Sequence, residues 1–321
     1  MATKPQNSDK PLVVIAIGGN SLITDSEHMS VVDQYRVAGE TAAHIVPIVA
    51  SGNRVVVTHG NGPQVGFILM RSELTKDALH QVPLANCVAD TQGSIGMQIA
   101  QSLQNEFLRQ GREHQVVAIV TQVVVDPEDP SFDKPTKPIG PFMSGDEAQQ
   151  HAESDGWAIA EEANRGWRRV VPSPAPIEII ELPAIRTLLD SGVLVVAAGG
   201  GGIPVIFKPD GSLRPRPAVI DKDAASCLLA QGLGAKVLIF TTDVDKVALN
   251  FGTPEQIEIE RMSTSECRGY LDEGHFAVGS MRPKIEAALA FLESGGEEVI
   301  ITRPHNLESA MRGTKGTHIV Q

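Results

Sequence analysis

The stretch VLVVAAGGGGIP, residues 193–204, decides the fold. Its first half is an apolar run of strand length without polar alternation, which is typical of a strand buried on both faces of a parallel sheet. Four consecutive glycines, 199–202, follow directly. Because glycine lacks a Cβ, its backbone can approach a ligand closely and successive N–H groups can point at an anion. The stretch therefore predicts a buried parallel strand that ends in a candidate anion-binding turn.

Two earlier apolar runs end in the same way. Residues 12–17 lead into Gly18-Gly19-Asn20-Ser21, and residues 54–58 lead into HGNGPQ at 59–64. The remaining apolar runs of strand length span residues 115–125, 236–241 and 298–302.

Helical patterns lie between these strands. One runs from about residue 33 to 50, with Gly52 just past its end, and another from about 89 to 109, followed by Gly111. Alternating strands and helices predict a layered α/β fold with helices on both faces of a mainly parallel sheet. Ligands of such sheets bind at the carboxyl ends of the strands, where the three glycine turns would converge.

Composition narrows the class of protein. A chain of 321 residues is long enough for one large α/β domain, or for one such domain with an appended lobe. Its 42% hydrophobic and 21% charged residues are ordinary for a globular protein. The net charge of −12 argues against a nucleic-acid partner. The three cysteines are scattered, which argues against a disulfide framework or a zinc site and favours a reducing cytoplasm. Residues 1–10 are polar, and the apolar run at 12–17 is too short for a signal-peptide core or a membrane helix. We therefore expect a soluble cytoplasmic protein with a flexible extension at 1–10 and its main domain at 11–321.

One segment interrupts the alternation of strands and helices. Both tryptophans, Trp157 and Trp167, lie between residues 126 and 176. Prolines cluster at both ends of this segment, at 127, 130, 135, 138 and 141 and at 172, 174 and 176. We expect residues 126–176 to be a protruding subdomain inserted in the main domain, and we call this segment the lobe.

Common catalytic motifs are absent from the sequence. It has no GxxxxGK[ST] P-loop, no protein-kinase glycine loop, no GxGxxG in a Rossmann context, no HExxH and no serine or cysteine in a nucleophile elbow. His59 ends a predicted strand, and packing beneath the glycine turn explains it at least as well as catalysis. A phosphate-handling protein with this sequence must use another arrangement.

Three lysines are candidates for binding an anion. Lys222 lies in IDKDAA at 220–225, where Asp221 can cap a helix and Asp223 falls in its first turn. Lys284 lies near the start of another predicted helix, and Lys137 lies between prolines in KPTKPIGP at 134–141. Taken singly, each lysine fits a solvated surface position more often than a ligand contact. The late stretch 241–245, TTDVD, either frames a nucleotide or caps the next element.

Taken in order, these motifs resemble the carbamate kinases, a family of the amino acid kinase superfamily. The resemblance covers residues from about 12 to 320 and rests on GGN (18–20), HGNGPQ (59–64), TQVVVDP (121–127), KPTKPIGP (134–141), GWRRVVPSP (166–174), GGGGIP (199–204), IDKD (220–223) and PKIEA (283–287). It implies a three-layer αβα sandwich, a homodimer, and reversible phosphoryl transfer between ATP and carbamate with Mg²⁺. It also implies that the enzyme runs toward ATP in arginine catabolism, with no nucleic-acid or membrane partner.

The resemblance also implies site residues. Lys222 and Lys284 would bind the phosphates and the transferring phosphoryl group, with Asp223 holding both lysines and Lys137 reaching carbamoyl phosphate from the lobe. No protein ligands are assigned to Mg²⁺, which would be bound mainly through the nucleotide. The backbone turns would cradle carbamate and phosphate through Gly18, Gly19, Asn20, Gly60, Asn61, Gly200 and Gly201. The nucleotide, which Lys222 and Lys284 also contact, would lie near Thr241, Thr242, Asp243 and Val244.

Two departures and two alternatives accompany this interpretation. Arg282 stands where the family has an apolar residue, and Asp243 stands where a glycine is common. Another amino acid kinase, acting on a carboxylate such as N-acetylglutamate, is one alternative, although the proline-rich lobe and Lys137 argue against it. A regulatory protein that kept the fold without the chemistry is the other, although the three residues Lys222, Asp223 and Lys284 are all present.

Overall fold

The computed structural model describes residues 10–18, 28–162, 165–277 and 279–321. Their largest sheet has eight strands, all parallel to their neighbours except for the antiparallel pair β16–β17. In spatial order, these strands are β15 (Arg261–Ser263), β17 (Thr317–Val320), β16 (Glu298–Thr302), β12 (Val237–Thr241), β1 (Leu12–Ile17), β2 (Arg54–His59), β9 (Leu194–Val196) and β3 (Val116–Ala118).

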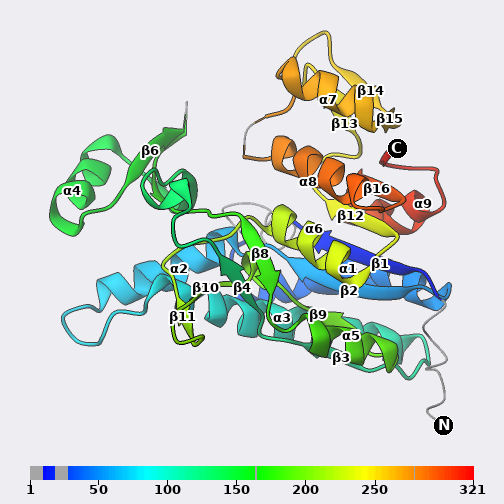
Figure 1. Ribbon diagram of the computed structural model, residues 1–321, viewed down its shortest axis with the longest axis horizontal. Helices are drawn as coiled ribbons and strands as arrows, with labels where there is room; N and C mark the ends of the chain where they lie inside the picture. Colours follow the sequence, from blue (N-terminus) through cyan, green and yellow to red (C-terminus); the bar gives the residue numbers. More distant parts are fainter. Residues whose placement is uncertain (1–9, 19–27, 163–164, 278) are drawn as a thin grey trace.

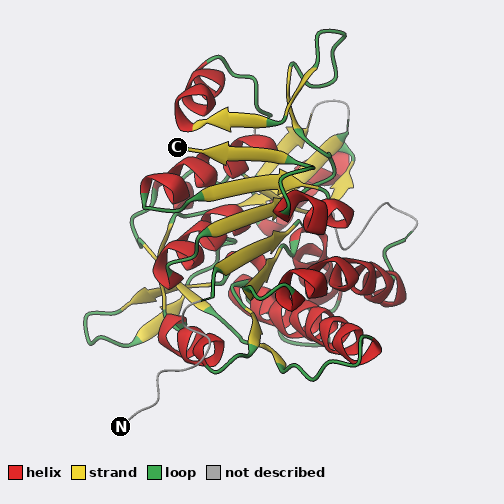
Figure 2. Ribbon diagram, turned by 90° about the vertical axis from the view of Figure 1, so that its right-hand side faces the viewer, coloured by secondary structure: helices red, strands yellow, loops and turns green. Residues whose placement is uncertain are grey.

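Helices cover both faces of this sheet, as Figure 2 shows. Alternate residues of β1 point to opposite faces, so Val14 joins one apolar cluster and Ile15 the other. On the Ile15 side the cluster includes residues of α1 (Val31–Ala50), α3 (Leu84–Arg109) and α9 (Leu307–Met311). On the Val14 side it includes residues of α5 (Leu182–Asp190), α6 (Lys222–Leu233), α7 (Thr264–Asp272) and α8 (Met281–Glu293). The predicted α/β fold with a buried, mainly parallel sheet is confirmed.

The prediction of one strand over 115–125 is wrong. The chain leaves the main sheet after β3 and begins β4 (Gln122–Val125) in a second sheet. Thr121 causes the break: its hydroxyl donates to Ile119 O and accepts from Ala198 N, and its own N–H donates to Gln92 Oε1. The polar pair Thr121-Gln122 inside the apolar run is the only local sign of this turn.

Three smaller sheets complete the structure of the described residues. The four-stranded sheet has the order β11 (Leu213–Pro215), β10 (Ile203–Phe207), β4 and β8 (Pro176–Ile179). The two-stranded sheet pairs β13 (Val247–Leu249) with β14 (Ile257–Ile259), and the three-stranded sheet has the order β5 (Lys137–Met143), β7 (Gly166–Val171) and β6 (Ile159–Glu162). The remaining elements are α2 (Gly62–Leu74), α4 (Gly145–Asp155) and the short 3₁₀ helices Pro130–Phe132, Gly199–Gly201 and Pro304–Asn306.

The three-stranded sheet and α4 lie wholly between residues 126 and 176. Figure 1 shows α4 and β6 projecting from one end of the molecule. Ile139 and Val171 join this part to α2 and α3 through a small apolar cluster with Val65 and Val88. These observations fit an inserted subdomain at 126–176, a boundary that stays a prediction. Of the predicted extension, residues 1–9 lie outside the described part of the chain.

Across the described ranges, no helix combines the length and the apolar composition needed to cross a membrane.

Candidate active site

The three glycine turns meet at the carboxyl ends of the main-sheet strands. Gly18 follows β1, Gly60 and Asn61 follow β2, and Gly200 follows β9; all four line one cavity of about 250 Å³. Lys137, Lys222, Asp223 and Lys284 line the same cavity. The structure therefore brings together residues that are far apart in the sequence. Gly19 and Asn20, which were predicted to take part, lie outside the described residues.

The four-glycine turn packs too closely for any side chain. A Cβ on Gly200 would lie 2.2 Å from Asn61 Nδ2, and one on Gly201 would lie 2.4 Å from Ile220 O. Gly200 and Gly201 also have φ of 64° and 89°, in the left-handed region that other residues avoid. The described lining of the cavity does not include Gly201, so its contribution is to let Ile220, two residues before Lys222, come close.

Asp223 holds two lysines in the cavity. This carboxylate, almost fully buried in the first turn of α6, accepts from Lys222 Nζ at 2.5 Å and from Lys284 Nζ at 3.0 Å. Lys222 begins α6, and Lys284 lies in the first turn of α8, which packs beside α6. With both lysines protonated, the three groups together carry a net charge of +1. They present two ammonium groups to the cavity where the backbone turns converge.

Burial and neighbouring charges shift the two lysines in opposite directions. Burial, followed by the charge of Lys222, lowers the pKa of Lys284. Burial would also lower the pKa of Lys222, but the charge of Asp223 and its hydrogen bond outweigh it and raise that pKa. The site therefore keeps a firmly charged lysine next to one whose charge is less favourable. An anion placed between them would favour the charged form of both.

Asp221 connects the lobe to this cluster. Its Oδ1 caps α6 by accepting from Asp223 N at 2.8 Å and Ala224 N at 3.3 Å, and its Oδ2 accepts from Lys137 Nζ at 2.9 Å. Burial alone would raise the pKa of Asp221, but the charges of Lys137 and Lys222 hold that pKa below its usual range. The predicted N-cap is confirmed. The pairing with Lys137, across 84 positions of sequence, had no local signal.

The predicted nucleotide segment lies at one side of the cavity. Thr241, Thr242 and Asp243 line it, whereas Val244 is not part of its described lining. Thr241 Oγ1 accepts from Gly18 N at 3.1 Å, which joins the end of β12 to the end of β1. Gly279 and Ser280 also line the cavity, directly before α8. Sequence reasoning did not select these two residues, although both stand in the stretch that contains Lys284.

His59 lies beneath the glycine turn. Its ring is buried, its Nδ1 donates to Gly60 O at 2.9 Å, and a Cβ on Gly199 would lie 2.2 Å from its Nε2. Burial lowers the pKa of His59 to about 4, so the imidazole is neutral at pH 7. These contacts favour the packing interpretation over catalysis.

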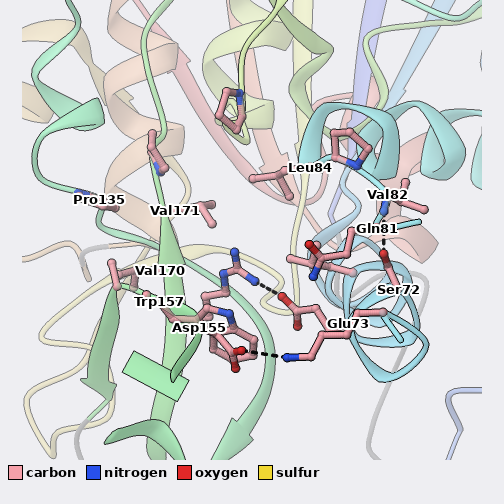
Figure 3. A pocket seen from close by; sticks show the side chains of 18 of the residues that line it. Ser72, Glu73, Gln81, Val82, Leu84, Pro135, Asp155, Trp157, Val170 and Val171 are labelled. Atoms are coloured by element: carbon pink, nitrogen blue, oxygen red, sulfur yellow. Dashed lines mark hydrogen bonds and ion pairs between the residues drawn. The ribbon is translucent and has the colours of Figure 1, made fainter. Parts of the chain in front are cut away.

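A much larger cleft of about 1390 Å³ lies between α2 and the lobe (Figure 3). Four of its charged side chains pair across it, Glu73 with Arg169 and Asp155 with Lys76. None of the glycine turns borders this cleft within the described residues. We place the candidate active site in the smaller cavity because there two lysines share one carboxylate beside the closely packed glycine turns.

Carboxylates, histidines and cysteines do not gather into a metal site in the described ranges, where no group of three or more could hold an ion. Asp221 and Asp223, which line the cavity, are both engaged by lysines.

Residues 11–303 match the amino acid kinase family. The chain is 49% identical to the carbamate kinase-like protein YahI of Escherichia coli, over 97% of this chain and 99% of that protein. It is 43% identical to the carbamate kinase of Pyrococcus horikoshii, over 96% of this chain and 98% of the relative. A solved structure of carbamate kinase from Giardia lamblia bound to AMP-PNP has a TM-score of 0.90 and 39% identity, over 97% of this chain and 99% of that one.

Proposed function

The chain belongs to the carbamate kinases of the amino acid kinase family, and on that premise we propose that it transfers a phosphoryl group reversibly between ATP and carbamate, giving ADP and carbamoyl phosphate. One observation carries the proposal: Asp223 holds Lys222 and Lys284 together where three glycine turns meet. In this phosphotransferase, catalysis depends on neutralising the charges of two anionic substrates and positioning them, more than on acid–base chemistry.

The reaction explains why the cavity needs no general base. Carbamate and the terminal phosphate of ADP are both anions that are already nucleophilic. The obstacle is their mutual repulsion during in-line attack, which positioning and charge neutralisation overcome. A lysine suits this task because its compact ammonium on a flexible stem can follow the phosphoryl group. The neutral, buried His59 takes no part in proton transfer in this mechanism.

We assign roles by position in the cavity. Lys222 and Lys284 contact the transferring phosphoryl group, and Asp223 sets the spacing between the two ammonium groups. The backbone around Gly18, Gly60, Asn61 and Gly200 faces carbamate and the transferred phosphate. The resemblance to the carbamate kinases assigns the same role to Gly19 and Asn20, which lie outside the described residues. Lys137 exchanges its partner Asp221 for carbamoyl phosphate when substrate binds.

The nucleotide lies on the side of the cavity lined by Thr241, Thr242, Asp243 and Lys284. Magnesium would be held mainly by the phosphates of the nucleotide, because the carboxylates of Asp221 and Asp223 are already engaged by lysines. Magnesium keeps several waters and needs few protein ligands when phosphates coordinate it. The metal supplies charge neutralisation at the phosphate oxygens.

The proposal extends to a cytoplasmic homodimer that runs toward ATP synthesis in arginine catabolism. Its support is the resemblance to the carbamate kinases. Lys137, which reaches the cavity from the lobe, favours carbamate over a larger carboxylate acceptor. A monomeric mass in light scattering would contradict the dimer.

Substitution of the two lysines tests the mechanism. Lys222→Ala and Lys284→Ala should each lower kcat by a factor on the order of 10²–10³, as expected for the loss of one preorganised donor. Lys236→Ala is the matched control, because Lys236 is an exposed lysine paired with Glu297 on the surface. Wild-type kcat in both Lys222→Ala and Lys284→Ala would rule out the mechanism.

A further inference from the structure

Two consecutive polar residues on α3, Thr91 and Gln92, are buried behind the active site. Their side chains are 1% and 4% exposed, and neither residue belongs to the described lining of the cavity. A core position normally takes an apolar residue, because a buried polar group costs stability unless it is hydrogen-bonded. Both side chains are hydrogen-bonded, and their partners include Asn61, which lines the cavity, and Gly199, in the four-glycine turn.

Gln92 joins two loops through its amide group. Its Nε2 donates to Thr121 O at 3.1 Å and to Gly199 O at 3.0 Å, and its Oε1 accepts from Thr121 N at 2.7 Å. Thr121 in turn accepts from Ala198 N through its hydroxyl and from Ile203 N through its carbonyl. One side chain therefore fixes both ends of the four-glycine turn.

This turn requires such support. Ala198 is a non-glycine residue with φ of 50°, and residues 200–202 all have positive φ. Backbone held in sparsely populated conformations persists only where its surroundings over-determine it. Without Gln92, the N–H of Thr121 would lose its buried partner, and the carbonyl of Gly199 would keep, among the described residues, only the hydrogen bond from Gly202 N.

Thr91 orients Asn61. The Thr91 hydroxyl donates its single hydrogen to Val88 O at 2.6 Å, so the group that faces it at 2.9 Å must be a donor. The NH₂ end of the Asn61 amide therefore faces Thr91, which fixes how this cavity-lining side chain is turned. Asn61 in turn packs against Gly200, so the two loops are held together.

We propose that Thr91 and Gln92 are positioning residues that set the carbamate and phosphate end of the site through Asn61 and the turn 198–202. The inference rests on the proposed function, because it takes these loops to be the substrate cradle. It places two positioning residues on α3, a helix that contributes no residue to the described lining of the cavity. The hydrogen bonds of the Thr91 and Gln92 side chains go to Asn61, Val88, Thr121 and Gly199. The nucleotide end of the cavity, lined by Thr241, Thr242, Asp243 and Lys284, should therefore be insensitive to substitution of these two residues.

The test compares Thr91→Val and Gln92→Met with the wild-type enzyme. Each should lower kcat/KM for carbamoyl phosphate by about 10–100-fold, in line with the loss of other residues that orient a ligand-contacting group. KM for MgADP should stay within about twofold, because the nucleotide end does not depend on these contacts. Thr91→Ser keeps the hydroxyl and should restore most of the activity.

Gln98→Met provides the matched control. Gln98 is another buried glutamine of α3, 1% exposed, whose Oε1 has no partner within the described residues. Its substitution should leave both KM values unchanged, whatever it does to Tm. Wild-type kinetics in Thr91→Val and Gln92→Met, or an equal rise in KM for both substrates in those variants, would overturn the inference.

A binding readout separates this inference from the proposed function. Carbamoyl phosphate should raise the Tm of the wild-type protein and of Gln98→Met, but raise it much less in Thr91→Val. A wild-type protein that neither makes ATP nor gains Tm with carbamoyl phosphate contradicts the proposed function. A Thr91→Val protein stabilised as strongly as wild type contradicts the positioning role.

Discussion

At the scale of single residues, two carboxylates hold the three lysines of the site in place. Asp223 accepts from two lysines, and Asp221 both caps α6 and accepts from a lysine of the lobe. Breaking a buried pair by removing one member leaves the other charge uncompensated, which costs far more than the pair itself contributes. His59, beneath the glycine turn, is buried in its neutral form. Protonation of its ring would likewise place an uncompensated charge in the interior of the protein.

His59 should make stability depend on pH. Its pKa is about 4 in the folded protein and 6.5 as the unperturbed value, so below pH 6.5 the unfolded chain binds a proton that the folded chain does not. The free energy of unfolding is therefore fully retained above pH 6.5 and falls as pH drops toward 4, by about 3 kcal/mol from this residue. Urea unfolding of the wild-type protein and of His59→Asn at pH values from 4 to 7 measures this dependence of the free energy of unfolding on pH.

The variant should show a shallower fall than wild type over that range. His80→Asn, at an exposed histidine, should keep the wild-type slope. Equal slopes in His59→Asn and wild type would show that this imidazole does not titrate as its burial requires.

At the scale of elements, the carboxyl ends of β2 and β9 form one side of the site because glycine lets them approach one another. Gly200 packs on Asn61, Gly199 on His59 and Gly201 on Ile220. The turn thus joins the end of β2 to the segment that leads into α6. This geometry explains why four glycines stand in a row.

Gly200→Ala tests the close approach. Gly211, in the β10–β11 hairpin, has φ of 80° and nothing within 4 Å of an added Cβ, so Gly211→Ala carries the backbone strain without the clash. Both variants should lose about 1 kcal/mol of stability to the left-handed backbone. Only Gly200→Ala should also lower kcat/KM for carbamoyl phosphate, by about 10-fold or more, as substitution of residues that orient a ligand-contacting group does. Equal activities of the two alanine variants would refute the packing role.

Sequence reasoning succeeded where the signal was local. Buried runs such as 12–17 and 298–302 match their strands, and Asp221 caps α6 as expected. It failed at 115–125, where contacts of Thr121 with residues 92 and 198 break the strand. It also missed the pairing of Asp221 with Lys137, because hydrophobic periodicity carries no information about which distant side chains meet.

At the scale of the whole molecule, the lobe contributes a lysine to a cavity built by the main sheet. Lys137 is the first residue of β5, after the proline-rich loop, and its partner Asp221 is the N-cap of α6. The ion pair is partly exposed, so it contributes only about 0–1 kcal/mol to stability. In the proposed mechanism its importance is for substrate, which would compete with Asp221 for the same ammonium group.

Lys137→Ala should raise KM for carbamoyl phosphate about tenfold, because one charge-assisted contact is worth about 1.5–3 kcal/mol at most sites. KM for MgADP and Tm should change little. Lys134→Ala, in the same loop but exposed, is the control. Kinetics of Lys137→Ala that match those of Lys134→Ala would exclude the lobe from substrate binding.

ATP formation from carbamoyl phosphate and MgADP tests the central claim most directly, with acetyl phosphate as the comparison donor. A cavity with two lysines on one carboxylate, converging glycine turns and Lys137 from the lobe should yield rapid ATP synthesis from carbamoyl phosphate and little from acetyl phosphate. Lys222→Ala and Lys284→Ala should abolish most of it. No ATP from the wild-type protein, while nucleotide still binds, would contradict the assignment.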